Sequence, residues 1–440
     1  MFQRFQQSRW PQLLLWVLII AAIVAAPAVL PVFRLNLLGR FLSLAIVALG
    51  IDLIWGFTGL LSLGQGIFFA LGGYAAAMYL QLNSSSGFPN GIPEFFGLYG
   101  VKQLPAFWQP FHSPLFTLVA IWLIPAVLAA VLGNLVFRNR IKGVYFSILT
   151  QAALLVFFNF FNGQQKLING TNGLKTDVTQ LFGQMVGSPE MQRGFFWFTA
   201  LMVIAAWVFV RWVVRGRFGD VLIAIRDDEP RLRFAGFNPT LFKTIVFAIA
   251  GGLAGIGGAL YTVQSGIVSP QYMTVPFSIE MVIWVAVGGR GTLVGAILGA
   301  VAINYAKSLV SEAMPQSWLF IQGGLFILVV TALPEGVIGW WRSDGPRNLL
   351  SRLGLARRMG TYPQLELDGQ YASHTVLGRS SHWFQPSLEA AQYWFQPLCD
   401  PGPGRQHAVV AMLHAACDIR HAPDIAQIAS RHVPPVDEFQ

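Results

Sequence analysis

Eleven charged residues gather between residues 211 and 243, and their types suit recognition of a partner better than covalent catalysis. The segment carries both signs of charge: Arg211, Arg215, Arg217, Arg226, Arg231, Arg233 and Lys243, with Asp220, Asp227, Asp228 and Glu229 between them. Apolar runs flank it on both sides, Gly194 to Val210 and Thr244 to Val263. So many charges do not stay in hydrocarbon. We therefore expect a charged docking surface where two membrane spans end.

The pattern inside this segment predicts two short helices. Four apolar residues recur at the i, i+3, i+4 and i+7 spacing of one helix face: Phe218, Val221, Leu222 and Ile225. Pro230 disfavours helix at the residue before it, so the first helix should end near Asp227. Asp228 should then cap a second helix, which Gly236 stops.

We expect this helix pair to dock into a partner protein and to bury its apolar face, Phe218 included, in the contact. Charged residues at the rim would set the register of that contact: Arg226, Asp228, Glu229 and Arg231. The alternative interpretation is a solvated connector, because surface charges tolerate substitution well.

The motifs of the common membrane enzymes are missing. The chain contains no GxxxxGK[ST] phosphate loop, no HExxH and no GxSxG. We single out three ionisable residues in or at the edge of apolar runs, Asp52, Glu280 and Lys307, and each lies near the end of its run. The cysteines and histidines between Cys399 and His421 do not follow a zinc spacing. We therefore expect no enzyme activity, no cofactor and no metal.

The composition indicates a polytopic membrane protein. Of 440 residues, 54% are hydrophobic and only 11% are charged, against about 25% charged in soluble domains. The net charge of +9 does not require a nucleic-acid partner, because Lys and Arg concentrate in cytoplasmic loops of membrane proteins.

The apolar runs predict an all-α fold with about eight to ten transmembrane helices. Ten runs occur: Leu13 to Val32, Leu37 to Trp55, Ile67 to Leu82, Leu115 to Phe137, Val144 to Phe161, Phe195 to Val214, Thr244 to Val263, Phe277 to Val287, Thr292 to Val310 and Trp318 to Trp340. The eighth is far shorter than the roughly 20 residues that cross a bilayer, so we expect a half-helix or one part of a broken pair. We divide the chain into a first span (1–36), a membrane domain (37–341) and a cytoplasmic tail (342–440).

The positive residues predict which ends face the cytoplasm. Arg138 to Lys142, the segment 211–243 and the arginines after Trp341 fall on one side if the chain crosses ten times. That side should be the cytoplasm and should hold both termini. The connection Arg34 to Arg40 is an exception, because its two arginines would face outward. Beyond about residue 369 the tail has no sustained periodicity, and we expect disorder there.

Glycine and amide residues indicate where a polar solute could pass. The segment Thr58 to Gly66 holds too many glycines for a regular helix, and Gly288 to Gly291 repeats this feature, as an internal repeat would. The connection Asn162 to Gly173 is rich in amides. From these features we take three residues as a translocation path: Gln65, Asn172 and Glu280. Close helix packing explains most of the glycines equally well.

Four motifs taken in order resemble the permease subunits of bacterial branched-chain amino acid ABC importers. They are Gly59 to Gly66 followed by Phe68 to Ala75, then Gly170 to Leu174, and Gly288 to Gly295. Within that family the chain resembles the second urea-type permease subunit, on four features: Gln164-Gln165, Ala224 to Glu229, Lys307-Ser308 and Ser311-Glu312. The resemblance covers about Phe41 to Pro363. Glu229 and Gly236 match the family's Glu-x-Ala-Ala-x-x-x-Gly pattern, whereas Arg231 and Leu232 replace its alanines.

The resemblance implies a subunit of an ATP-driven importer in the bacterial inner membrane. Its partners would be a homologous second permease, two ATP-binding cassette subunits, a periplasmic solute-binding protein and membrane lipid. The segment 211–243 would couple ATP hydrolysis to transport. Urea or a similar small amide is the implied substrate, with branched-chain amino acids as the alternative. A channel or ion-coupled carrier is a further alternative, but it leaves the docking segment without a role.

Overall fold

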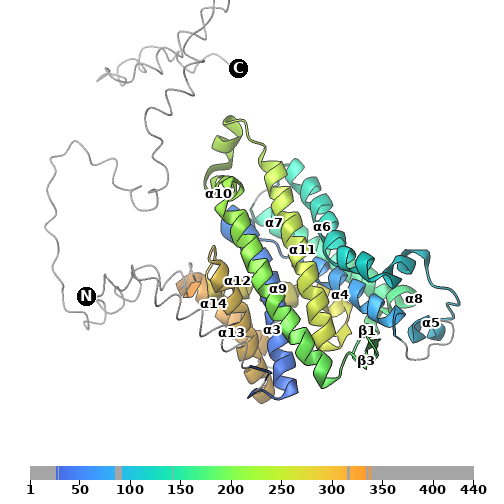
Figure 1. The fold of residues 1–440 in the computed structure, drawn as a ribbon. Coiled ribbons are helices and arrows are strands. Elements are labelled where there is room, and N and C mark those ends of the chain that lie inside the picture. Colours follow the sequence, from blue (N-terminus) through green and yellow to red (C-terminus); the bar gives the residue numbers. More distant parts are fainter. Residues whose placement is uncertain are drawn as a thin grey trace, which may run out of the picture. The chain divides into compact units, whose positions relative to one another are not determined.

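The computed structural model describes residues 26–27, 29–84, 92–141, 143–314, 318–332 and 336–337, and within them the fold is almost entirely helical (Figure 1). The long helices are α3 (Val32–Thr58), α4 (Gln65–Leu82), α6 (Pro114–Arg138), α7 (Val144–Gly163), α9 (Pro189–Arg215), α10 (Arg217–Phe234), α11 (Pro239–Ser265), α12 (Val275–Gly288), α13 (Leu293–Ala313) and α14 (Trp318–Ala332). Each predicted apolar run from the second to the tenth overlaps with one of these helices. Within the described residues, six helices are long and apolar enough to cross a membrane: α3, α6, α7, α9, α11 and α13. The predicted all-α, polytopic fold is therefore confirmed.

Short elements connect the long helices at one end of the bundle. They are α5 (Glu94–Leu98), η2 (Ala106–His112), α8 (Gln165–Ile168), η3 (Gly170–Asn172), η4 (Pro270–Met273) and the strands β1 (Leu174–Lys175), β2 (Gln180–Leu181), β3 (Gln184–Met185) and β4 (Ile267–Val268). β1 pairs with β4 in antiparallel fashion, with Leu174 opposite Val268, and β2 pairs with β3. The first predicted span and the tail after residue 337 lie outside the described residues.

The core forms where α11 packs against α3, α4 and α6. Most of α3 is buried, whereas α7 and α9 keep broad apolar faces exposed, as lipid-facing or partner-facing helices do. Glycines let α4 and α11 approach closely, because the backbone of Gly72 touches that of Gly255 and leaves no space for a side chain. The predicted packing role of the span glycines is confirmed at this crossing.

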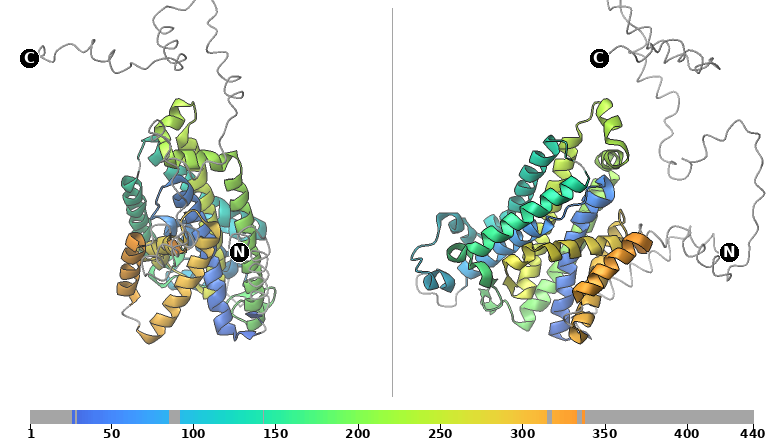
Figure 2. Two further views of the ribbon diagram at one scale, coloured as in Figure 1. Left: turned by 90° about the vertical axis from the view of Figure 1, so that its left-hand side faces the viewer. Right: turned by 180° about the vertical axis from the view of Figure 1, so that it is seen from behind.

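Two helices begin or end inside the bundle rather than at its surface. α4 starts at Gln65 after the irregular segment Gly59 to Gly64. This segment is held by α7, whose Ser147 hydroxyl donates to the Leu61 carbonyl (2.6 Å) and whose Thr150 hydroxyl accepts from the Leu63 amide (3.1 Å). α12 has 14 residues, or about 21 Å of helix, which is less than the roughly 30 Å of a bilayer core. It runs across the bundle (Figure 2), as expected for a short element buried among longer ones.

Two of the three positive groups share one end of the bundle, as predicted, and the third, after Trp341, lies outside the described residues. α10 joins α9 to α11, and the Thr240 hydroxyl at the start of α11 donates to Phe137 at the end of α6 (3.3 Å), so the segment 211–243 and Arg138 share one end (Figure 1). Arg40 lies near the opposite end, where its guanidinium donates to the Gln264 and Ser265 carbonyls (3.2 and 3.4 Å). These are terminal carbonyls of α11, which a cation stabilises. Arg40, one of the two arginines that are exceptions to the predicted orientation, therefore has a structural role.

Candidate functional site

α10 consists of two helical segments separated by a kink. Asp228 leaves the helical conformation (φ −155°, ψ 88°), and its Oδ1 accepts a hydrogen bond from the Arg231 amide (3.1 Å). The second segment ends at Phe234, and Gly236 follows with φ +86°, a left-handed conformation that glycine adopts without strain. The predicted kink, cap and stop are all confirmed.

The first segment buries half of its predicted apolar face within the chain itself. Leu222 and Ile225 are buried against α3, α9 and α11 of the same chain. The Phe218 ring lies 5.6 Å from that of Phe242 on α11. The chain therefore covers Leu222 and Ile225 with its own helices, whereas Phe218 and Val221 stay half-buried, and docking of this face into another protein stays a prediction. Helix periodicity identifies a buried face but not what buries it.

Glu229 does not lie at an exposed rim either. Its side chain is 8% exposed and forms two ion pairs, one with Arg233 Nη2 and one with Lys243 Nζ, each at 2.7 Å. Lys243 belongs to α11 and is itself buried. The Glu229–Lys243 ion pair holds the second segment of α10 against α11. The expected role of Glu229 in setting the register of a contact by rim charge is corrected accordingly.

The second segment carries the most exposed aromatic residue of α10. Arg231 and Phe234 are 87% and 92% exposed, and Phe237, just beyond the helix, is half exposed. We call Pro230, Arg231, Phe234 and Phe237 the tip of α10. An apolar residue this exposed beside charged groups is typical of a protein contact. The prediction from the sequence did not include Phe234 and Phe237, although two phenylalanines close to a glycine stop in a charged segment could have indicated an exposed contact.

Arg226 connects the first segment of α10 to the end of α3. Its Nη1 donates to the carbonyl of Gly56 (3.0 Å), which lies in the last turn of α3 and lacks a helical partner there. One turn earlier on α3, Asp52 Oδ1 accepts from the amide of Gly291 (2.6 Å), in the turn between α12 and α13. The end of α3 therefore links α10 to the α12–α13 turn.

Arg290 adds a second contact between the end of α3 and the turn between α12 and α13. Its guanidinium lies over the Trp55 ring, 5.2 Å from the ring centroid. Gly291 has φ +75° and packs against Gly56, so a side chain at position 56 would collide with the turn. Asp52, which the sequence marked only as an ionisable residue near a span end, thus has a specific partner 239 residues away.

The structure places the three residues predicted to form a path on α4, α12 and η3. Gln65 is buried at the start of α4, and within the described residues neither of its amide atoms has a hydrogen-bond partner. Glu280 is buried on α12 and ion-paired with Lys307 of α13 (2.7 Å). Asn172 is exposed on η3, at the end of the bundle opposite α10. A neighbour that the sequence did not single out is Ser278, whose buried hydroxyl lies beside Gly66 and also has no described partner.

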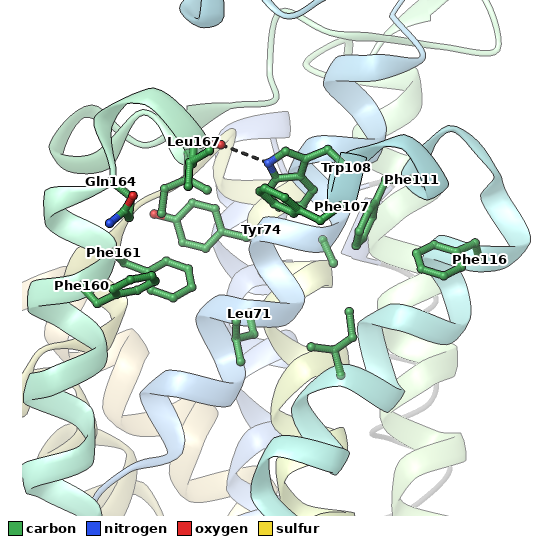
Figure 3. Close-up of a pocket in the computed structure, with 13 residues that line it drawn as sticks. Leu71, Tyr74, Phe107, Trp108, Phe111, Phe116, Phe160, Phe161, Gln164 and Leu167 are labelled. Carbon is green, nitrogen blue, oxygen red and sulfur yellow. Dashed lines mark hydrogen bonds between the residues drawn. The ribbon is translucent and has the colours of Figure 1, made fainter. Parts of the chain in front are cut away.

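A cavity of about 500 Å³ lies between α4, α6, α7 and η2 (Figure 3). Its lining is mainly aromatic and aliphatic: Leu71, Tyr74, Ala75, Phe107, Trp108, Phe111, Phe116, Ile124, Phe160, Phe161, Leu167 and Ile168, with Gln164. The Trp108 indole donates to the Leu167 carbonyl (3.1 Å) and ties η2 to α8. The Tyr74 hydroxyl is buried and has no partner among the described residues. This volume lies within the range of small-molecule pockets.

Comparison with known proteins agrees with this arrangement. Residues 33–330 match the family described as branched-chain amino acid transport system / permease component. The chain belongs to this family. It is therefore a permease component rather than an enzyme, and a multi-pass protein of the bacterial inner membrane.

Individual relatives are distant. The chain is 27% identical over 314 residues, 67% of each chain, to the high-affinity branched-chain amino acid transport system permease protein LivM of Salmonella typhimurium. It is 22% identical to LivH of the same organism, over 67% of this chain and 91% of that one. The ribose import permease protein RbsC of Escherichia coli is 23% identical over 42% of this chain and 57% of its own length. No solved structure matches the chain.

Proposed function

We propose that this chain is the membrane subunit of an ATP-driven importer, and that the tip of α10 contacts an ATP-binding cassette subunit. The carrying observation is the exposure of Phe234 and Arg231 on a segment that the buried Glu229–Lys243 pair holds rigidly to α11. A rigid exposed aromatic residue beside charges has the properties of an interface hot spot. A homologous permease, a second ATPase subunit and a periplasmic binding protein complete the proposed assembly.

The contacts of α10 provide a route by which movement at the tip reaches the membrane interior. Arg226 bonds to the last turn of α3, and Asp52 on that helix bonds to the turn between α12 and α13. α12 is the short helix that carries Ser278 and Glu280. A displacement of α10 would therefore move α3 and the start of α13 together, and α12 with them.

For the substrate we propose urea or a similarly small uncharged amide. Two observations support a neutral polar solute. The buried groups without described partners beside the irregular segment are the amide of Gln65 and the hydroxyl of Ser278, which donate and accept hydrogen bonds as an amide solute requires. The charges nearby, Glu280 and Lys307, neutralise each other.

Branched-chain amino acids are the second candidate, and the aromatic cavity around Tyr74 favours them. Its apolar lining suits an aliphatic side chain better than urea, and the relatives LivM and LivH belong to branched-chain amino acid transport systems. The two candidates require different surroundings, because urea, unlike an aliphatic side chain, gains little from contact with an apolar cavity wall.

Uptake measurements with the complete transporter in proteoliposomes test both proposals. Labelled urea and labelled leucine are compared with and without this subunit, and then with Ala75→Phe, which narrows the aromatic cavity. Urea uptake that requires the subunit and survives Ala75→Phe supports the first candidate. Leucine uptake that Ala75→Phe abolishes supports the second. Equal urea uptake with and without the subunit removes urea.

A further inference from the structure

A separate small cavity lies at the charged end of α9, away from the tip of α10. Its volume is about 200 Å³, and it lies between the end of α3, the last turns of α9 and the start of α13. The lining residues are Phe57, Trp207, Arg211, Val214, Arg215, Gly291, Thr292, Leu293 and Val294. Neither the proposed docking contact nor the proposed solute path uses it.

The two arginines of this cavity have no carboxylate counterion among the residues that the structure describes. Arg211 and Arg215 are four residues apart on α9 and so lie on the same helix face. Within the described part of the chain, neither forms an ion pair or a hydrogen bond to a carboxylate. The Arg211 guanidinium lies over the Trp207 ring, 5.1 Å from its centroid, which restricts its orientation. Two positive charges on a shared wall favour an anion, and guanidinium groups match the geometry of phosphate oxygens.

The start of α13 adds to this positive environment. The Thr292 hydroxyl donates to the Gly289 carbonyl (2.6 Å), and it accepts no hydrogen bond from the first turn of the 21-residue helix. The helix therefore begins without a side-chain cap, and its first residues, Leu293 and Val294, belong to the cavity wall. The positive end of a helix dipole attracts anions, so this wall acts in the same direction as the arginines.

The position of the cavity along α9 indicates where the anion comes from. Arg211 and Arg215 end a long apolar helix on the side that also carries Arg138, and Trp212 between them is strongly exposed. Tryptophan at the end of an apolar span marks the level of lipid headgroups. A basic pocket between helices at this depth is suited to an anionic headgroup. We propose that this cavity binds the phosphate of an anionic phospholipid of the cytoplasmic leaflet and braces α3, α9 and α13 against one another.

Native mass spectrometry of the full-length purified chain tests the proposal. The protein is incubated with phosphatidylglycerol or with phosphatidylcholine, and the retained lipid is counted. We expect preferential retention of phosphatidylglycerol. The pair Arg211→Gln and Arg215→Gln should weaken retention roughly tenfold or more, because each arginine near an anionic surface contributes measurably to binding. Val294→Phe should weaken it as well, since it fills the cavity and leaves both arginines in place.

A matched control is the pair Arg138→Gln and Arg140→Gln, which removes two exposed arginines from the same side of the bundle, outside the cavity. This pair should retain lipid as the wild type does. The proposal is overturned if the cavity variants retain as much phosphatidylglycerol as the wild type. It is also overturned if the control pair lowers retention as much as the cavity variants do. Protection from thermal unfolding by inorganic phosphate, without retention of phosphatidylglycerol, overturns the lipid assignment in favour of a free anion. If the double variant does not fold, Arg215→Gln alone serves, because its side chain is exposed.

Discussion

The two segments of α10 differ in the exposure of their apolar side chains. The first, up to Asp227, buries Leu222 and Ile225 against the body of the same chain, whereas the second projects Arg231 and Phe234 into the surroundings. One continuous charged stretch of sequence therefore contains both the buried Glu229–Lys243 ion pair, which we call the brace, and the exposed tip of α10. Charge content alone does not distinguish the two, because Glu229 is buried and Arg231 is exposed although only one residue lies between them.

The largest effect is expected from breaking the brace. Glu229→Ala leaves Lys243 buried without its carboxylate, and an uncompensated buried charge of this kind destabilises a protein by about 3–5 kcal/mol. The thermal unfolding midpoint of the purified chain should fall clearly. Asp227→Ala, close by in the sequence and exposed, is the control and should leave the midpoint nearly unchanged.

A double variant sharpens this first prediction. Glu229→Gln with Lys243→Met removes both charges, and replacing a buried ion pair by uncharged groups is often neutral. It should recover most of the stability lost in Glu229→Ala. If Glu229→Ala unfolds at the wild-type temperature, the Glu229–Lys243 pair does not stabilise α10, and the distinction between a stabilising brace and an exposed tip does not hold.

The second effect concerns the tip. Phe234→Ala should leave stability unchanged, because the ring is almost fully exposed, but it should weaken association with the ATPase subunit by about 2 kcal/mol or more if the ring is a hot spot. Co-purification and substrate-stimulated ATP hydrolysis in proteoliposomes measure this loss. Val119→Ala, which truncates an exposed apolar residue of α6, is the control. Wild-type hydrolysis in the tip variant would remove Phe234 from the contact.

The third effect separates docking from transmission. Asp52→Ala removes the acceptor of the Gly291 amide, a loss of about 1–3 kcal/mol at the junction between α3 and the α12–α13 turn. The ATPase subunit should still co-purify, because the tip is untouched, while substrate stimulation of hydrolysis falls. Asp52→Asn keeps an oxygen acceptor and should restore part of the stimulation. Loss of co-purification in Asp52→Ala contradicts this division of roles.

The smallest effect is expected from the exposed charge at the tip. Arg231→Ala removes a surface ion pair with Asp228, and such pairs contribute about 0–1 kcal/mol. Stability should hardly change, and association with the ATPase subunit should become less sensitive to salt. A large drop in the unfolding midpoint would show that Arg231 belongs to the brace.

Much of the fold follows from the sequence because apolar length and local turn chemistry are properties of short segments. The helix positions, the short α12, and the kink and cap at Asp228 all depend on residues within a few positions of each other. The relation between Pro230 and Asp228 is local, so it could be read directly.

The site depends instead on contacts between distant segments. Glu229 finds Lys243 on the next helix, Arg226 finds Gly56, and Asp52 finds Gly291. The sequence contains each of these residues but not their pairing, since pairing is decided by how the helices pack. For the same reason the periodicity of α10 does not reveal that Leu222 and Ile225 pack against helices of the same chain.

Cross-linking from the tip tests the central claim most directly. The native cysteines, Cys399 and Cys417, are first replaced by serine, and single cysteines are then introduced in place of Phe234, Arg231 or Leu222 in the assembled transporter. A short thiol cross-linker should join positions 234 and 231 to the ATPase subunit and leave the buried position 222 unmodified. Intact assemblies without a cross-link at either tip position would contradict the proposed role of α10 as the contact with the ATPase.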